Sequence, residues 1–256
     1  MEEQLKEIIL EAGEIFKEGY YSHKQITHKA IKDLVTKYDI AIEKFLIEKF
    51  SKVFTEFNII AEESDDGTIP FNNSIIIDPI DGTTNFVNKV PHCAISIGIY
   101  KEKKPFIGIV YNPILDEYFS AKVGEGAYCN GKKITVSPEK EFSLSLIGTG
   151  FPYTSSHNKD DLRFVMTNLE RILPVSQDIR RFGSASVDLC MVANGVYEGY
   201  YEINLKAWDV AAGIIILNEA GGTVTNHFGK EFNMFKDRCI IATNNKIHNT
   251  LTELIQ

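Results

Sequence analysis

Five acidic residues lie directly against strongly apolar segments of the chain, where carboxylates are uncommon. They are Asp39, Glu62, Asp78, Asp81 and Asp209. Carboxylates drawn together at the ends of buried strands repel one another unless a cation lies among them, and the apolar segments offer no matching set of Arg or Lys. A donor set of oxygens, without Cys or His at ligand spacing, is typical of Mg²⁺ or Mn²⁺. The sequence therefore predicts a divalent cation site rather than a zinc site.

Each of these acids also has an ordinary explanation when it is considered alone. Asp39 could reach solvent from the face of a helix, and Asp209 could cap the helix that begins beside it. Glu62 and Glu63 could open a polar loop. For a single acid the ordinary explanation is the more common one, so the metal hypothesis depends on the number of acids that share apolar surroundings.

The residues after Asp78 indicate what such a cation would act on. Pro79 fixes φ and supplies no N–H, so the chain is expected to turn directly after the strand and to aim Asp78 and Asp81 at one site. Residues 82–84, Gly-Thr-Thr, then offer main-chain N–H groups in a tight turn of the kind that holds a phosphate. A cation beside a phosphate cradle predicts phosphoryl chemistry.

Several other kinds of phosphoryl enzyme lack their motif in this chain. Neither G-x-x-x-x-G-K-[ST] nor G-x-G-x-x-G is present. An aspartyl-phosphate enzyme carries its second acid two positions after the first, whereas Asp81 follows Asp78 by three. No cysteine begins the C-x5-R pattern of a cysteine phosphatase. Direct attack on phosphorus by a metal-bound water remains.

Hydrophobic periodicity predicts two helices near the start of the chain and two strands after them. Residues 5–16 recur at helical spacing, and Gly19 is predicted to end that helix. A second amphipathic pattern covers residues 34–53 and places Asp39 on or beside its apolar stripe. The short apolar runs 59–61 and 75–77 each precede an acid, so both are predicted to be buried strands that end in carboxylates.

The remainder of the chain predicts short strands followed by mixed elements. Residues 93–135 alternate brief strands with turn residues, and Asn130-Gly131 is a strong hairpin signal. Gly221-Gly222 is predicted to cap the C-terminus of an apolar helix. The predicted elements of the second half are strands near Leu146 and over residues 199–202 and 239–242, and helices over residues 160–171, 184–193 and 210–220 and from about Lys246.

Composition narrows the class of protein. The 256 residues are 44% hydrophobic, and a net charge of −8 disfavours direct binding to nucleic acid. The four cysteines form no C-x-x-C pair, so we expect free thiols in a reducing cytoplasm. No run of ~20 apolar residues and no basic leader is present, so we expect no membrane segment. Because no linker interrupts the chain, we expect an α+β fold in which a lobe of residues 1–140 abuts a lobe of residues 141–256 as one compact unit.

Separated motifs, taken together, resemble a known family. The motifs are D-L-V-T-x-x-D over residues 33–39, E-E at 62–63, D-P-I-D-G-T-T-N-F over 78–86, W-D-V-A-A-G over 208–213 and E-A-G-G from Glu219. In this order they resemble the inositol monophosphatases, which are lithium-sensitive, magnesium-dependent sugar phosphatases. The resemblance covers most of the chain and implies a layered αβαβα fold with the acids clustered between the two lobes.

The resemblance also implies a role for each matching residue. It gives one metal to Glu62, Asp78 and the main-chain carbonyl of Ile80, a second to Asp78, Asp81 and Asp209, and a weaker, mobile one to Glu63 through water. Thr83 and Asp39 would orient the attacking water. The implied substrate contacts are Gly82 and Thr83 for phosphate, and Ser184, Ala185, Glu202 and Asp209 on the side of the sugar or inositol.

The implied function is hydrolysis of inositol monophosphate by a homodimer that uses two or three Mg²⁺ ions, with Mn²⁺ as a possible substitute. Residues 88–92, Asn-Lys-Val-Pro-His, depart from the pattern common in inositol-type members, and the segment between Glu63 and Ser74 is short. Fructose 1,6-bisphosphate, histidinol phosphate and 3′-phosphoadenosine 5′-phosphate therefore remain alternatives, although the T-T-N-F ending favours inositol phosphate over the nucleotide. An alternative of another class is a partner-binding regulatory protein in which the phosphatase site is incidental.

Histidines and tyrosines give weaker signals. His92, His157, His227 and His248 show no spacing that suggests a triad or a metal pair, so each is expected to be structural or solvated. The tyrosines over residues 197–201 are expected to pack within a strand rather than to form an aromatic binding patch.

Overall fold

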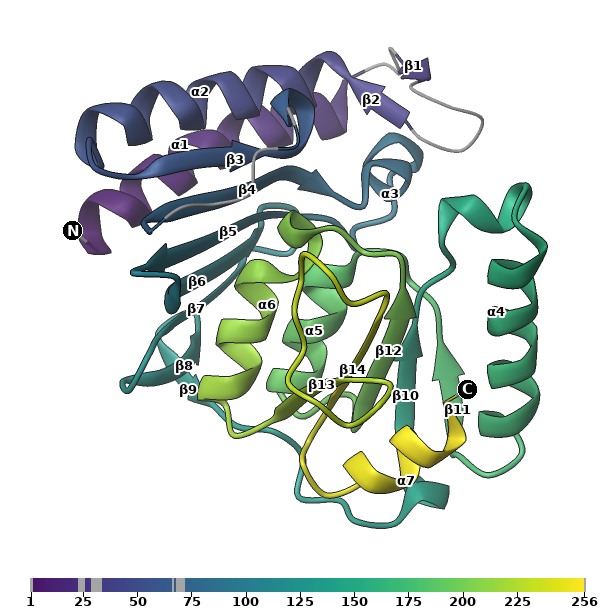
Figure 1. Cartoon of the computed structure of the whole chain (residues 1–256). Helices are drawn as coiled ribbons and strands as arrows, with labels where there is room; N and C mark the ends of the chain where they lie inside the picture. The colour runs from purple at the N-terminus through teal and green to yellow at the C-terminus, as the bar shows by residue number, and fades with distance from the viewer. Residues whose placement is uncertain (1, 23–25, 29–33, 66, 68–71, 256) are drawn as a thin grey trace.

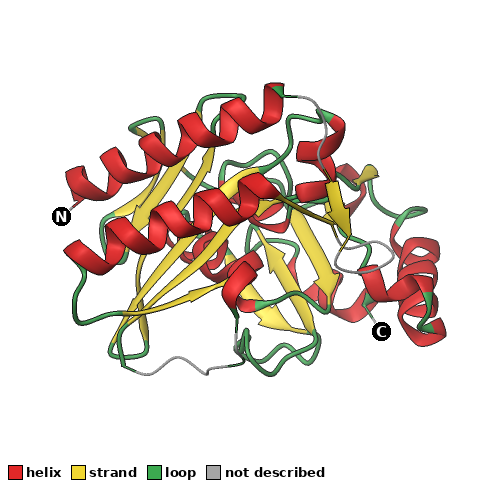
Figure 2. Ribbon diagram, turned by 90° about the horizontal axis from the view of Figure 1, so that it is seen from above, coloured by secondary structure: helices red, strands yellow, loops and turns green. Residues whose placement is uncertain are grey.

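Five layers of helix and sheet make up the computed structural model, which describes residues 2–22, 26–28, 34–65, 67 and 72–255. Helices α1 (Glu2–Tyr21) and α2 (Lys37–Val53) cover one face of a seven-stranded sheet (Figures 1 and 2). Helices α5 (Ala185–Ala193) and α6 (Ala207–Glu219) lie between that sheet and a five-stranded one. Helices α4 (Lys159–Ile172) and α7 (His248–Leu254) cover the outer face. The predicted αβαβα fold is confirmed.

The seven-stranded sheet has its strands in chain order. They are β3 (Asn58–Ala61), β4 (Ser74–Asp81), β5 (Ala94–Lys101), β6 (Lys104–Asn112), β7 (Glu117–Lys122), β8 (Gly126–Cys129) and β9 (Lys132–Ile134). Strands β3 and β4 are parallel, and every later pair is antiparallel. The predicted hairpin at Asn130 and Gly131 is present, with φ values of 49° and 75°. Positive φ at both positions is what a two-residue hairpin turn requires.

The five-stranded sheet mixes distant segments of the second half of the chain. Its order is β11 (Asp178–Arg180), β10 (Leu146–Thr149), β12 (Gly199–Ile203), β14 (Cys239–Thr243) and β13 (Thr223–Asn226). Strand β10 is parallel to its neighbours β11 and β12, whereas β14 is antiparallel to its neighbours β12 and β13. Strands β11 and β13 were not predicted, because three or four residues without clear alternation carry little strand signal.

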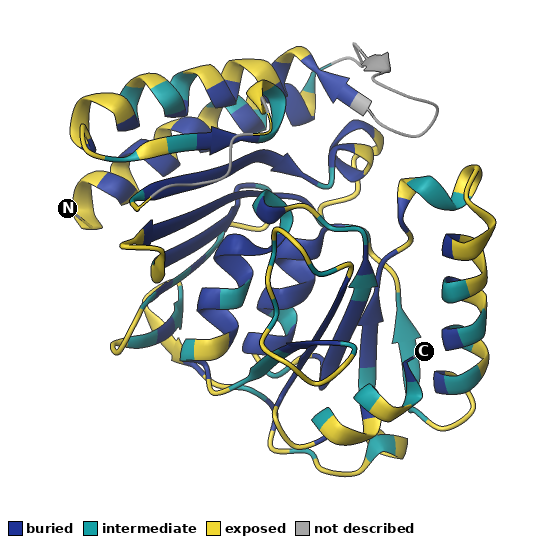
Figure 3. Ribbon diagram, viewed as in Figure 1, coloured by how far each residue is buried: buried dark blue, intermediate teal, exposed yellow. Residues whose placement is uncertain are grey.

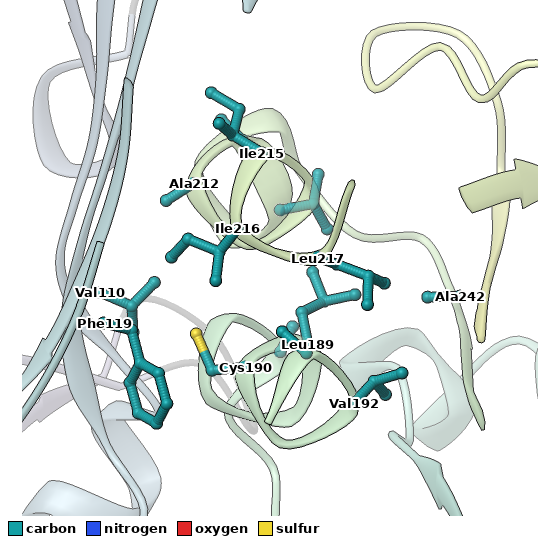
Figure 4. Packing of buried hydrophobic residues seen from close by; sticks show 14 of the residues in the cluster. Val110, Phe119, Leu189, Cys190, Val192, Ala212, Ile215, Ile216, Leu217 and Ala242 are labelled. Atoms are coloured by element: carbon teal, nitrogen blue, oxygen red, sulfur yellow. The ribbon is translucent and has the colours of Figure 1, made fainter. Parts of the chain in front are cut away.

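The central helices are apolar on nearly every side, and they therefore lie in the middle layer, where both faces are covered (Figure 3). Leu189 and Cys190 of α5 meet Ile216 and Leu217 of α6 in the core between the sheets (Figure 4). Helix α6 also lies directly on the seven-stranded sheet, since a Cβ at Gly98 would lie 2.7 Å from the Cβ of Ala211. This close approach holds the second turn of α6 against the sheet.

Two predicted boundaries near the N-terminus are wrong. Gly19 does not end the first helix, which continues to Tyr21. A Cβ at Gly19 would lie 2.5 Å from the Tyr38 ring and 2.7 Å from the Phe86 ring, so glycine there permits a close tertiary contact. The second helix begins at Lys37 and not at Leu34, because the three residues before it form strand β2 (Leu34–Thr36), paired with β1 (Ile26–His28).

The remaining elements are short, and two of them, α3 and η1, adjoin the acids in the chain. They are helix α3 (Thr83–Asn88) and the 3₁₀ turns η1 (Glu62–Ser64), η2 (Phe142–Leu144) and η3 (Tyr153–Ser156). Within the described ranges, no helix combines the length and the apolar character that crossing a membrane requires. Buried residues from both halves of the chain, such as Ile76, Phe119 and Ile216, share one hydrophobic core.

Candidate active site

A β-bulge brings Asp78 and Asp81 together at the end of β4. Asp78 pairs with Ser96 and Asp81 with Ala94, so three steps along β4 correspond to two along β5. Residues three apart in a regular strand point to opposite faces, and the extra residue of the bulge reverses that alternation. The expected turn directly after Asp78 is therefore wrong: the strand continues through Pro79 to Asp81, and the bulge aims both carboxylates at one place.

Asp209 completes a cluster with these two residues. One carboxylate oxygen from each of Asp78, Asp81 and Asp209 lies within 4.8 Å of the other two. Asp78 and Asp209 also each have an oxygen held by a main-chain donor: Asp78 Oδ1 accepts the N–H of Ile80 at 3.0 Å, and Asp209 Oδ2 accepts the N–H of Lys206 at 2.7 Å. The second of these bonds satisfies a donor at the start of α6, so Asp209 does contact its helix terminus as well as the cluster.

The electrostatics of the cluster favour a cation. Burial raises the pKa of Asp78 well above its ordinary value, and the charges of Glu62, Asp81 and Asp209 raise it further. Burial and then Asp81 do the same to the pKa of Asp209. A divalent cation would relieve both penalties, and the all-oxygen donor set fits Mg²⁺ or Mn²⁺. The residues of this site therefore suit the metal that the sequence predicts.

Strand pairing places Glu62 near Asp78, although Glu62 is not among the three residues whose oxygens converge within 4.8 Å. Ala61 is paired with Ile77 in the parallel strands β3 and β4, so Glu62 and Asp78 follow at the same edge of the sheet. The main-chain N–H of Glu63 donates to Glu43 Oε2 at 2.7 Å, which fixes the start of η1. Glu43 is only 4% exposed, and it was missed by the sequence reasoning although it follows Asp39 by one helical turn on the same face of α2.

Asp39 and Thr83 lie side by side next to this cluster. The Thr83 hydroxyl lies 3.2 Å from Asp39 Oδ1 and 3.0 Å from the carbonyl oxygen of Ile80. The other oxygen of Asp39 accepts the main-chain N–H of Thr36 at 2.8 Å and its hydroxyl at 2.5 Å, in a capping box that begins α2. Burial raises the pKa of Asp39 to about 6, even though these hydrogen bonds act to lower it.

The expected phosphate turn is the first turn of a short helix. Gly82 precedes α3 with φ of 85°, a left-handed conformation that glycine adopts without strain. A Cβ there would also lie 3.1 Å from the carbonyl oxygen of His92 and 3.2 Å from that of Gly183. The N–H groups that begin a helix have no acceptor within it, so the segment after Asp81 presents donors suited to an anion.

On the predicted substrate side, Glu202 lies against Tyr200 and Gly150. Tyr200 donates its hydroxyl to Glu202, and burial raises the pKa of Glu202 to about 8. A Cβ at Gly150 would overlap the Glu202 carboxylate, so any larger residue there would force that carboxylate to move. Ser184 is the residue before α5, and its hydroxyl donates to Asp81 Oδ2 at 2.6 Å; Ala185 begins the helix.

A second set of contacts joins the 78–86 motif to α5. The Asn85 side-chain amide donates to the carbonyl oxygens of His92 and Phe182, each at 2.7 Å. His92 in turn lies 3.0 Å from Asp188 Oδ1 and packs against the Phe182 ring. The contacts of Asn85 with residues 92 and 182 were not predicted, because only the fold brings these segments together.

Known proteins resemble this chain over nearly its whole length. The family model described as the inositol monophosphatase family matches residues 1–256. Inositol monophosphatase 2 of Solanum lycopersicum is 39% identical over 239 residues, which cover 91% of this chain and 89% of that protein. Nus factor SuhB of Pasteurella multocida (strain Pm70) is 40% identical over 223 residues, covering 85% of this chain and 82% of the other.

A solved structure shows the same architecture. The crystal structure of extragenic suppressor protein suhB from Bartonella henselae superposes with a TM-score of 0.90 at 33% identity, covering 99% of this chain and 97% of that one. The motifs, the five-layer fold, the acid cluster and the full-length match point to one conclusion. This chain belongs to the inositol monophosphatase family.

Proposed function

We propose that this protein hydrolyses inositol monophosphate to inositol and inorganic phosphate with the help of Mg²⁺. The observation that carries the proposal is the convergence of the Asp78, Asp81 and Asp209 carboxylates within 4.8 Å. This cluster lies beside the Thr83 and Asp39 pair and is followed directly by the N–H groups that begin α3. Cation, water and phosphate positions would then be adjacent.

The acids divide naturally into two sets of metal ligands. Glu62, Asp78 and the Ile80 carbonyl would hold one ion, whereas Asp78, Asp81 and Asp209 would hold the second. Glu63 would serve a third and weaker ion through water. When bound, such cations lower the pKa of water and neutralise charge on the phosphate and the leaving oxygen.

Thr83 and Asp39 would orient the attacking water. The Thr83 hydroxyl has one proton and two acceptors within reach, Asp39 Oδ1 at 3.2 Å and the Ile80 carbonyl oxygen at 3.0 Å. With the Ile80 carbonyl engaged by a cation, the hydroxyl would donate to Asp39, and its lone pairs would accept a proton of the water. With its pKa at about 6, Asp39 is mostly ionised at neutral pH and would therefore serve as the acceptor. Holding the water in line with phosphorus removes orientational freedom that would otherwise add to the barrier.

The remaining residues would bind the substrate. Main-chain N–H groups at Gly82 and Thr83 would donate to the phosphate oxygens. Ser184, Ala185 and Glu202 would contact the inositol hydroxyls, and Asp209 would face the ester oxygen. The name of the Solanum relative and the T-T-N-F ending support inositol monophosphate over fructose 1,6-bisphosphate, histidinol phosphate or 3′-phosphoadenosine 5′-phosphate.

Phosphate release from inositol monophosphate and from these three other esters tests the proposal. We expect Mg²⁺-dependent release that is fastest with inositol monophosphate, is supported by Mn²⁺, is inhibited by millimolar Li⁺ and is lost in excess EDTA. Asp81→Asn is the control for a contaminating phosphatase, because it removes a ligand charge with little change of shape. Undiminished release in EDTA would refute the metal mechanism, and a strong preference for another ester would refute the substrate.

A second candidate function is a regulatory role through a protein partner. It is favoured by the relative named Nus factor SuhB, which is 40% identical over 223 residues. Retention of the cellular role by Asp81→Asn would separate partner binding from hydrolysis. A homodimer and a cytoplasmic location likewise remain predictions, which size-exclusion chromatography with light scattering and cell fractionation would check.

A further inference from the structure

We propose that Ser186 is a positioning residue for the metal site, which holds Asp81 so that only one of its carboxylate oxygens faces the cation. The inference rests on the proposed metal-dependent function. It concerns a residue outside the predicted ligand set, on the second position of α5.

The contacts on Asp81 are concentrated on a single oxygen. Oδ2 accepts the main-chain N–H of Ser186 at 2.7 Å, the Ser186 hydroxyl at 2.5 Å and the Ser184 hydroxyl at 2.6 Å. A carboxylate oxygen offers about two lone-pair directions, so three donors saturate it. Oδ1 is then the oxygen that can approach Asp78 and Asp209.

The donors are rigid and shielded from water. Ser186 is 0% exposed, and Leu189 and Cys190, which follow on α5, are buried in the core between the sheets. The Ser186 N–H belongs to the first turn of a helix, where no intrahelical acceptor exists, so Asp81 supplies one from another element. A negative charge at this end of α5 is also favoured by the helix dipole.

Repulsion within the cluster explains why the hydrogen bonds to Asp81 are needed. Without a cation, the Asp78 and Asp209 carboxylates push Asp81 away from the position in which all three converge within 4.8 Å. Charge-assisted hydrogen bonds from buried donors oppose that movement. The site would then be formed before the metal arrives.

An ordinary helix cap would use the same hydrogen bonds, but it makes a different prediction. A cap alone affects the stability of α5 and leaves cation affinity unchanged. A positioning residue lowers cation affinity when its hydroxyl is removed, since partners that orient metal ligands typically change affinity by about 10- to 100-fold.

Titration of the purified protein with Mn²⁺ by calorimetry distinguishes a positioning residue from a helix cap. Ser186→Ala removes the hydroxyl and leaves the N–H in place. Ser145→Ala is the matched control, because Ser145 is also 0% exposed and its hydroxyl donates to the Glu141 carbonyl oxygen at 2.9 Å. We expect the dissociation constant to rise about 10- to 100-fold in Ser186→Ala and to stay within twofold of wild type in Ser145→Ala. Wild-type affinity in both variants would overturn the positioning role.

Two further variants keep the test decisive. If Ser186→Ala does not fold, Ser184→Ala removes another donor from the same oxygen and should also weaken Mn²⁺ binding, whereas unchanged affinity would overturn the proposal. Asp81→Asn tests the proposed function itself in the same titration. Failure of the wild type to bind Mn²⁺, or wild-type affinity in Asp81→Asn, would refute the metal site. If Asp81→Asn binds Mn²⁺ weakly while Ser186→Ala binds it as tightly as the wild type, only the positioning role is refuted.

Discussion

The Thr83 hydroxyl lies 3.2 Å from Asp39 Oδ1, although one residue begins α3 and the other belongs to the first turn of α2. Asp39 is fully buried, and its second oxygen is held by Thr36, so it has little freedom to move away. A hydroxyl fixed in this way can orient a water beside the acid cluster.

Removal of the Thr83 hydroxyl should therefore reduce turnover without weakening the binding of the metal ion. We expect Thr83→Ala to lower kcat by about 100-fold or more, in the range of positioned proton-transfer groups, while Mn²⁺ affinity changes little. Thr83→Ser keeps the hydroxyl and should retain most of the activity. Steady-state kinetics of both variants check this, and near-wild-type kcat in Thr83→Ala would contradict the role.

Glu202 should govern the choice of substrate more than the chemical step. In Glu202→Gln we expect kcat/KM for inositol monophosphate to fall about tenfold, the effect of about one hydrogen bond, while hydrolysis of an aryl phosphate without hydroxyls changes by less than about twofold. Tyr200→Phe is a useful companion, because it removes the hydroxyl that contacts Glu202. Equal losses on both substrates would place Glu202 in the catalytic machinery instead.

The same substitution should change how stability depends on pH. Burial raises the pKa of Glu202 from 4.5 to about 8, with Asp188 and Asp81 adding to the rise and Tyr200 and Arg181 opposing it. Between these values the folded protein keeps a proton that the unfolded chain releases, so this group lowers stability as pH rises. Glutamine cannot titrate. The wild type should therefore lose stability between pH 5 and pH 8 that Glu202→Gln keeps. The difference in unfolding free energy, Glu202→Gln minus wild type, should rise by more than about 1 kcal/mol over this range when measured by urea unfolding in EDTA. A flat difference would show that Glu202 ionises normally.

Glu43 should stabilise the segment that carries Glu62. Its Oε2 accepts the Glu63 N–H at 2.7 Å within a nearly buried environment. Glu43→Leu leaves that donor without its acceptor and should cost about 1 to 3 kcal/mol of unfolding free energy. Glu43→Gln keeps an acceptor oxygen and should cost clearly less. If both variants unfold alike in urea, the contact with Glu63 has no structural importance.

Local pattern predicted much of the fold and the identity of the acids. The apolar helix predicted over 210–220, its glycine cap and the Asn130-Gly131 hairpin each have a signal within a few residues, and each is present, although the helix begins three residues earlier and spans Ala207–Glu219. The acids of the cluster were recognisable because carboxylates beside apolar runs are unusual in themselves.

Features that depend on distant partners could not be predicted in this way. The bulge that aligns Asp78 with Asp81 depends on the register of β5, and the role of Gly19 depends on two rings that pack against it. Ser186 is a small polar residue in an apolar helix, and its partner lies 105 positions earlier. No short window of sequence contains such pairs.

Thermal melting of wild type and Asp81→Asn, each in EDTA and in Mg²⁺, tests the central claim that the clustered carboxylates form a cation site. Mg²⁺ at about a hundredfold excess over Kd should stabilise the wild type by about 2.7 kcal/mol. Asparagine keeps an oxygen that can accept from Ser184 and Ser186 but removes one charge. Asp81→Asn should therefore be at least as stable as wild type in EDTA, with little gain from Mg²⁺ and little activity. An Asp81→Asn protein that melts well below wild type in EDTA, yet gains as much from Mg²⁺, would contradict the claim.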